Sequence, residues 1–275
     1  MRFSITMIDD GDLESTLEVP NGNNPNQNAW LTITIRYYLN FVDGWNEKAG
    51  VTVERDTGKF VALDADKNAF PIVPWDTASK AKFAKDFQGG ENIWNYRFVL
   101  ITPQDYDGLD YESSNLDWKV RPNVLCLFRL VPAVRAVPHL SIDVVRLEKP
   151  DDNVGFRSHM TLYTHMDLYC NAFVHELGHA IGLEHIMVMK GDKQCKINPN
   201  AHRCYGVTKE EKATAMGSGK GMIPLFAKPW LDRVARHTED LKARPTTGWT
   251  ATLDTDTPPR KIPIGVVLVG EPSRW

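Results

Sequence analysis

Apolar and polar residues alternate most regularly between residues 30 and 42. A period of two predicts a β-strand with one buried face. The residues expected on that face are Leu31, Ile33, Ile35, Tyr37, Leu39 and Phe41. Residues 51–55 and 59–63 flank the turn sequence Asp-Thr-Gly and predict a hairpin. Further apolar runs predict strands at residues 96–101, 124–131, 140–147 and 160–165.

Helical spacing of apolar residues begins near Asp76 and predicts a helix that Gly89 and Gly90 end. Its apolar positions are Ala78, Ala81, Phe83, Ala84 and Phe87. Two more helices are predicted at about residues 167–181 and 228–241, and the thirty residues or so after Gly182 are predicted to be mostly loop. This mixture of helices and strands favours an α/β or α+β sheet domain.

Charge and hydropathy exclude several classes of function. The 275-residue chain carries 32 basic and 35 acidic residues, so it has no basic excess to neutralise phosphates and no nucleic acid is expected as a partner. No apolar run approaches the roughly 18 residues of a membrane-spanning helix. The first ten residues lack the apolar centre of a signal peptide. We therefore expect a cytoplasmic protein or one exported by a non-classical route.

The main chemical signal lies at residues 175–185, which fit the pattern H-E-x-x-H-x-x-G-x-x-H. His175 and His179 are four residues apart, so both imidazoles face one side of a helix and can reach one Zn²⁺ ion. His185 lies ten residues beyond His175, about 15 Å along a straight helix. The helix must therefore end before His185 can share the metal, and Gly182 is the residue that permits this turn.

Glu176 is the candidate catalytic residue because it lies too far round the helix to be the natural fourth ligand. It can instead contact the water in the open zinc position, take its proton and deliver that proton to a leaving amine. Three neutral histidines leave the metal doubly positive, which favours polarisation of a scissile carbonyl. The sequence predicts an enzyme that hydrolyses peptide bonds through a metal-activated water with Glu176 as the general base.

At these residues the chain resembles the metzincin clan of zinc metalloendopeptidases. A second likeness is Ala215-Met216-Gly217, which looks like the Met-turn that places a methionine beneath the zinc in that clan. The resemblance covers about residues 75–240 and implies a zincin-like fold. Such a fold has a twisted mixed sheet with a backing helix, an active-site helix and a smaller C-terminal subdomain. It also implies that residues 160–165 form an edge strand to which an extended peptide substrate pairs.

Other positions depart from the best-known subfamilies of that clan. Ile186 follows the third histidine, where those subfamilies tend to carry Ser, Glu, Pro or Asp. No tyrosine stands two residues after Met216, so the tyrosine ligand of astacin-like and serralysin-like enzymes is not expected. No cysteine switch of a propeptide is visible. The subfamily is therefore left unassigned.

Three regions are expected along the chain: a β-rich part at residues 1–70 without an assigned role, a metzincin-like catalytic domain at 71–242 with a subdomain break near residue 182, and a tail at 243–275. Cys195 and Cys204 are open to three interpretations: free thiols, a disulfide, or a second zinc site that also uses His202. Cys126 and Cys170 are expected to be buried thiols.

Other residues give weaker signals. The run Asp64, Asp66 and Asn68 resembles the start of a calcium loop, but Ala69 and Trp75 replace the required Gly and Glu, so a solvated turn is expected. His165 and Tyr163 are candidates for lining the cleft. Four histidines lack metal spacing and are expected to be structural or exposed; they are His139, His159, His165 and His237.

Two other functions remain open besides the zinc endopeptidase acting on a protein or peptide substrate. The first is a zinc-binding interaction module without catalysis. The second is an effector or toxin protease delivered into another cell, since neither a signal peptide nor a pro-segment is visible. The sequence does not define the substrate, the cleavage specificity or the oligomeric state.

Overall fold

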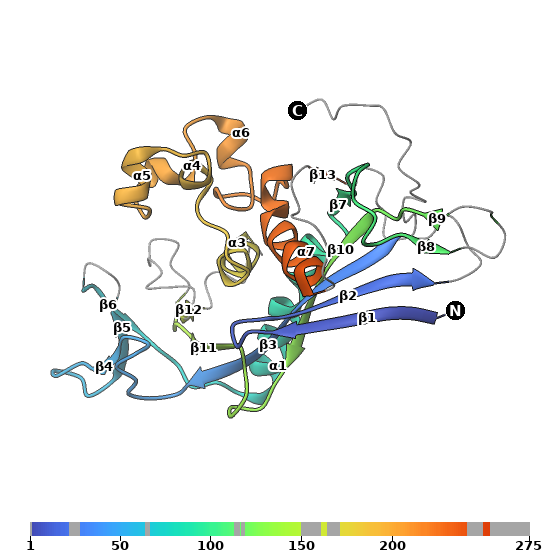
Figure 1. The fold of residues 1–275 in the computed structure, drawn as a ribbon. Helices are drawn as coiled ribbons and strands as arrows, with labels where there is room; N and C mark the ends of the chain where they lie inside the picture. Colours follow the sequence, from blue (N-terminus) through green and yellow to red (C-terminus); the bar gives the residue numbers. More distant parts are fainter. Residues whose placement is uncertain are drawn as a thin grey trace. The chain divides into compact units, whose positions relative to one another are not determined.

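The computed structural model describes residues 2–21, 28–63, 67–112, 116, 119–149, 161–163, 171–240 and 250–253. These residues form a mixed α+β fold with a mixed sheet and several helices (Figure 1). The chain divides into two compact units. The first comprises Met1–Thr34, Trp94–Arg129 and Gly221–Trp275, and the second comprises Ile35–Ile93 and Leu130–Lys220. The expected division at residues 1–70, 71–242 and 243–275 stays a prediction.

Antiparallel strands dominate the first unit. The strands lie in the order β1 (Arg2–Asp9), β2 (Glu14–Asn21), β3 (Ala29–Val42), β10 (Val124–Pro132), β7 (Phe98–Ile101) and β13 (Thr250–Leu253). Two of these strands, β3 and β10, continue into the second unit. β1 pairs with β2, β2 with β3, and β7 with both β10 and β13, all antiparallel. A separate two-stranded sheet of β8 (Tyr111–Glu112) and β9 (Lys119–Val120) also belongs to this unit.

Helix α7 (Lys228–Asp240) follows the short turn η3 (Pro224–Ala227) and packs on β1 and β2. Trp230 is fully buried, with its ring 5.5 Å from that of Phe98 and its indole N–H donating to the Leu127 carbonyl at 2.9 Å. A pair of arginines on the same helix, Arg233 and Arg236, binds Asp10 at 2.6 Å. The predicted last helix is therefore confirmed with nearly the expected bounds.

His237 on α7 has a structural role, as expected of a histidine without metal spacing. It is fully buried, its Nδ1 lies 2.8 Å from the Thr6 hydroxyl on β1, and its Nε2 lies 3.0 Å from the Ser15 hydroxyl on β2. One ring nitrogen donates and the other accepts, so one side chain joins the helix to two strands.

We expect His237→Leu to lower the free energy of unfolding by about 1–3 kcal/mol, because the buried Ser15 hydroxyl would lose its partner. Urea titration followed by circular dichroism measures this change. Lys228→Ala is the control on the same helix, since it removes only an exposed ion pair with Asp232 and should leave the urea midpoint unchanged. An unchanged midpoint for His237→Leu would contradict the structural role.

The second unit contains the parallel part of the sheet. β11 (Leu140–Val145) pairs in parallel with β3 and with β12 (Thr161–Tyr163). Burial along β3 alternates as predicted as far as Tyr37 except at Thr34, which is also buried, and Leu39 and Phe41 are only partly buried. The predicted hairpin is present as β4 (Val51–Val53) and β5 (Phe60–Leu63), and β6 (Ala69–Pro71) adds a third strand.

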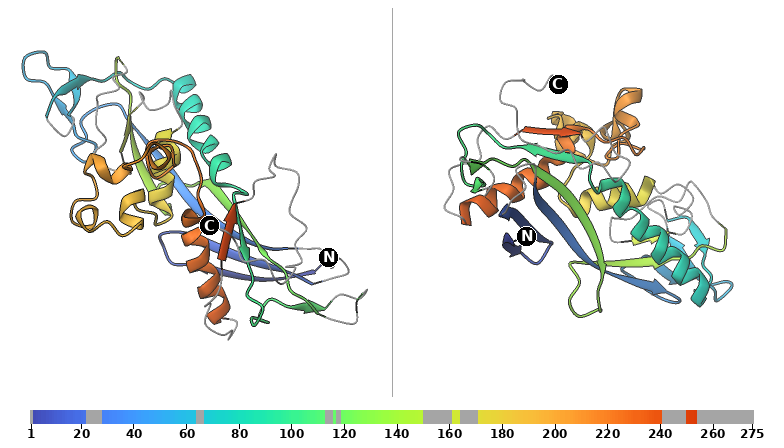
Figure 2. Two further views of the ribbon diagram at one scale, coloured as in Figure 1. Left: turned by 90° about the horizontal axis from the view of Figure 1, so that it is seen from above. Right: turned by 90° about the vertical axis from the view of Figure 1, so that its right-hand side faces the viewer.

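Helix α1 (Thr77–Gly89) begins where predicted, with the Asp76 carboxylate accepting from the Ser79 amide at 2.8 Å. The short helix α2 (Glu91–Trp94) follows it directly. α1 packs beside α3 (Asn171–Ala180), whose Phe173 ring lies 5.4 Å from Phe83 and 5.7 Å from Phe87 (Figure 2). The chain passes close to α3 at Gly90, since a Cβ there would lie 2.8 Å from the Leu177 side chain.

The stretch predicted to be loop after Gly182 contains four short helical segments: α4 (Ile186–Met189), α5 (Lys193–Ile197), η2 (His202–Tyr205) and α6 (Lys209–Lys212). The sequence carries signals for two of them. Asp192 caps α5, and Thr208 with Glu211 forms a capping box at α6. The segments are too short for apolar periodicity to reveal, which explains why the prediction missed them.

Candidate metal centre

Helix α3 carries the first two histidines of the motif. Phe173, Val174 and Leu177 are buried on one side of the helix. His175, Glu176 and His179 are only partly buried. The apolar side therefore fixes the helix against its neighbours, and the polar side is left for chemistry.

Gly182 ends α3 in the way the sequence predicts. Its φ is +94°, the Gly182 amide donates to the His179 carbonyl at 2.9 Å, and the Leu183 amide donates to the Gly178 carbonyl at 2.9 Å. These two bonds form a Schellman motif, which reverses the chain directly after the helix. The reversal returns His185 to the histidines on α3.

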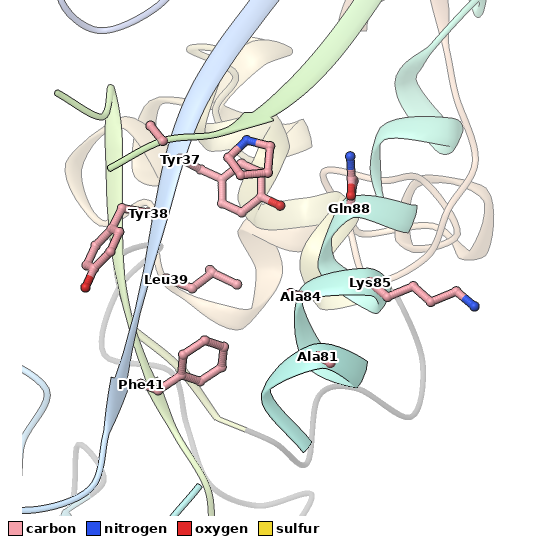
Figure 3. A pocket seen from close by; sticks show the side chains of 10 residues that line it. Tyr37, Tyr38, Leu39, Phe41, Ala81, Ala84, Lys85 and Gln88 are labelled. Atoms are coloured by element: carbon pink, nitrogen blue, oxygen red, sulfur yellow. The ribbon is translucent and has the colours of Figure 1, made fainter. Parts of the chain in front are cut away.

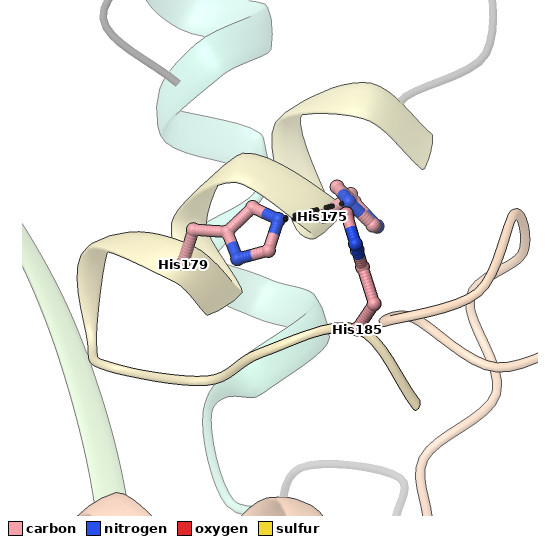
Figure 4. Close-up of side chains that lie close together, drawn as sticks. All are labelled: His175, His179 and His185. Carbon is pink, nitrogen blue, oxygen red and sulfur yellow. Dashed lines mark hydrogen bonds between the residues drawn. The ribbon is translucent and has the colours of Figure 1, made fainter. Parts of the chain in front are cut away.

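The three histidines converge on one point (Figure 4). The Nε2 atom of His179 lies 3.1 Å from that of His175 and 3.2 Å from that of His185. A tetrahedral ion 2.0–2.1 Å from two nitrogens would place them about 3.3 Å apart. The cluster therefore has the spacing of a metal site, and in the described part of the chain no carboxylate or thiol joins it.

Backbone carbonyls set the orientation of each ring. His175 Nδ1 lies 2.9 Å from the carbonyl of Ala215, His179 Nδ1 lies 2.8 Å from that of Leu183, and His185 Nδ1 lies 2.6 Å from that of Pro199. A carbonyl only accepts, so each Nδ1 carries the hydrogen. Each Nε2 is then left with a lone pair aimed at the common centre, as a metal ligand requires.

Burial favours the neutral form of two of these rings, those of His175 and His185. It lowers the pKa of His175 to about 3, with a further contribution from the neighbouring His179, and it lowers the pKa of His185. Neutral imidazole is the form that binds a metal ion. His175 and His185 are therefore in the protonation state that metal binding requires at neutral pH.

Glu176 lies between the two histidines of α3 in sequence but outside the cluster of possible ligands. Burial raises the pKa of its carboxyl group to about 7. A carboxylate with such a pKa exchanges protons readily near neutral pH. The general base predicted from the sequence has to exchange protons in this way.

Met216 lies in a tight turn and is fully buried. The turn at residues 214–217 is closed by the Gly217 amide, which donates to the Thr214 carbonyl at 3.0 Å. The carbonyl of Met216 accepts from the Ile186 amide at 3.2 Å, directly after the third histidine. Gly217 has no room for a side chain, since a Cβ there would lie 2.7 Å from the Tyr205 carbonyl. The turn thus joins both ends of the loop that follows His185.

Sequence reasoning missed Tyr205. Its ring lies 4.0 Å from that of His185 and is stacked on His175 at 5.5 Å with an interplanar angle of 19°. Burial raises the pKa of its hydroxyl group, and the charge of Glu176 raises it further. The only signal in the sequence is that Tyr205 directly follows Cys204.

The pair Cys195 and Cys204 is a disulfide, which decides among the three interpretations left open by the sequence. Cys126 is a buried free thiol as expected. Within the described ranges, the cluster of His175, His179 and His185 is the one group of possible metal ligands, so no second site forms with His202.

No match to this chain was found among family models, curated proteins or solved structures. The metal centre is therefore interpreted from its own geometry. The expected metzincin-like fold and the equivalence of Met216 to the Met-turn stay predictions.

Several other expected features fall outside the described residues: His159, His165, Cys170, Asp64, Asp66, and the side chain of Tyr163. The predicted strand at residues 160–165 is present as β12 over its central part. None of the described helices is both long and apolar enough to cross a membrane.

A pocket of about 410 Å³ lies between β3 and α1 in the second unit. Figure 3 shows Tyr37, Leu39 and Phe41 facing the helix there. Its lining contains one charged side chain, that of Lys85, and none of the three histidines. The pocket therefore lacks the convergent polar groups that mark a reactive site.

Proposed function

We propose that this protein is a zinc-dependent endopeptidase in which His175, His179 and His185 hold the metal. The observation that carries the proposal is the convergence of three Nε2 lone pairs at 3.1 and 3.2 Å beside a carboxyl group that does not join them. Three protein ligands with an open position are typical of catalytic zinc, whereas structural zinc is closed by four. Imidazole donors also suit copper, iron and nickel, so the metal needs a direct test.

The chemistry divides between the ion and the protein. When bound, the zinc ion supplies a Lewis acid that polarises the scissile carbonyl and lowers the pKa of the attacking water. Glu176 accepts the proton of that water as the new C–O bond forms, and it donates the proton to the amine as the C–N bond breaks. Burial supports this role because it raises the pKa of Glu176 to about 7.

The substrate we propose is a peptide in an extended conformation. β12 pairs with β11 alone among the described strands, so we propose its other edge as the place where the peptide adds a further strand. Backbone hydrogen bonds to such an edge bind a peptide with little dependence on its side chains. β12 ends eight residues before α3, on which His175 and Glu176 lie.

Metal removal tests the proposal. We expect the chain to bind one zinc ion and to cleave unstructured proteins, with cleavage lost on chelation and restored by added zinc. Mass-spectrometric mapping of new peptide ends in a proteome digest measures the activity. Zinc bound at one ion per chain without any cleavage would identify a non-catalytic interaction module. No zinc binding would refute the proposal.

A further inference from the structure

A disulfide encloses part of the loop between the third histidine and Met216. It joins Cys195 on α5 to Cys204 in η2 across a sequence separation of nine residues. Both sulfur-bearing side chains are fully buried, and they pack on Val188, which belongs to α4 directly after His185. The disulfide is thus close to the metal ligand in both sequence and structure.

Two parts of this loop contact His185. The carbonyl of Pro199, inside the disulfide-bonded ring, lies 2.6 Å from His185 Nδ1. Tyr205, the residue after Cys204, places its ring 4.0 Å from the imidazole of His185. One contact fixes the tautomer and direction of the ring, and the other covers its face. Neither His175 nor His179 has its Nδ1 acceptor inside the disulfide ring.

We propose that the Cys195–Cys204 disulfide positions His185 through Pro199 and Tyr205, so that reduction of the disulfide weakens metal binding. The inference rests on the metal-binding part of the proposed function and does not depend on peptide hydrolysis. In the reduction a dithiol gives up two electrons and two protons and becomes a disulfide itself. The S–S bond of the protein breaks, and two thiols form.

The reduced loop keeps other attachments. Arg203 binds the carboxylate of Asp192 at 2.6 Å and the side chain of Gln194 at 2.5 Å. Asp192 also accepts from the amide of Cys195 at 3.0 Å. These polar contacts join the two ends of the same loop at the protein surface. The expected consequence of reduction is therefore a looser third ligand, with the fold retained.

The experiment compares zinc affinities, using the zinc ion alone as the probe. We expect the double variant Cys195→Ala/Cys204→Ala to bind zinc about 10- to 100-fold more weakly than the wild type, the usual cost of losing support for a ligand. Competition with a chromophoric chelator measures the dissociation constant. The experiment uses this variant in place of chemical reduction of the disulfide, because thiol reductants bind zinc themselves. His202→Ala is the matched control: it alters an exposed residue of the same loop and should bind zinc like the wild type.

A second pair of variants tests the part of the proposal that runs through Tyr205, and it does so even if the double cysteine variant does not fold. Because the contact is between rings, Tyr205→Phe should keep the wild-type zinc affinity and Tyr205→Ala should lose about tenfold or more. Equal losses in both variants would assign the effect to the hydroxyl group and contradict positioning by the ring.

Failure of this inference differs from failure of the proposed function. A double cysteine variant with a zinc dissociation constant within about threefold of the wild type would overturn the inference, whatever the peptidase activity. A wild-type protein that binds zinc but cleaves no peptide would contradict the proposal that the protein hydrolyses peptide bonds. In that case a weaker affinity in the double variant would still support the positioning by the disulfide.

Discussion

Replacement of Glu176 by glutamine is expected to lower kcat/KM for peptide hydrolysis by about 10²- to 10⁴-fold, the usual contribution of a general base. Glutamine keeps the size of the side chain and cannot take a proton from water. Glu176 does not belong to the ligand cluster, so the variant should still bind one zinc ion per chain. Cleavage rates on an unstructured protein, with zinc measured by mass spectrometry, test both parts of this expectation.

Glu184→Gln provides the matched control for this variant. Glu184 is an exposed glutamate beside the third histidine, and it should tolerate the same change with nearly wild-type cleavage. A Glu176→Gln variant that holds zinc and cleaves at the wild-type rate would contradict the assigned mechanism. Loss of zinc from that variant would instead show that Glu176 supports the metal site.

His179→Ala is expected to weaken zinc binding by more than about 100-fold. His179 is the central ligand, since its Nε2 lies 3.1 Å from that of His175 and 3.2 Å from that of His185. Changes that only support a ligand cost about 10- to 100-fold, so removal of the ligand itself should exceed that range. Isothermal titration of the metal-free protein with zinc measures the effect.

His237→Ala offers a contrasting histidine for the same titration. His237 is buried in the other unit, and its ring contacts two hydroxyl groups. Its loss should lower stability and leave the zinc affinity unchanged. Tight zinc binding by His179→Ala would show that the three histidines do not act as one site.

The sequence was informative wherever chemistry depends on short spacing. The four-residue separation of His175 and His179 places both on one helix, and the positive φ of Gly182 returns His185 to them as predicted. The terminal helix and the buried face of β3 followed from periodicity in the same way. These features are local, so few residues decide each of them.

Features that depend on distant partners could not be predicted. Every residue has a backbone carbonyl, so no pattern marks Ala215 or Pro199 as the acceptor for a particular histidine. Tyr205 reaches the site because a disulfide and a close approach at Gly217 hold its segment there. The apolar run at residues 96–101 likewise predicts the strand β7 but not its pairing with β13, which lies about 150 residues later.

The three carbonyls that orient the histidines come from separate segments, at Leu183, Pro199 and Ala215. An ion held by the histidines would therefore tie all three segments to α3 through one set of bonds. Local unfolding of residues 183–217 then becomes a single cooperative event instead of three independent ones. Amide hydrogen exchange across these residues should slow together when metal binds, which gives a measure of site occupancy that needs no substrate.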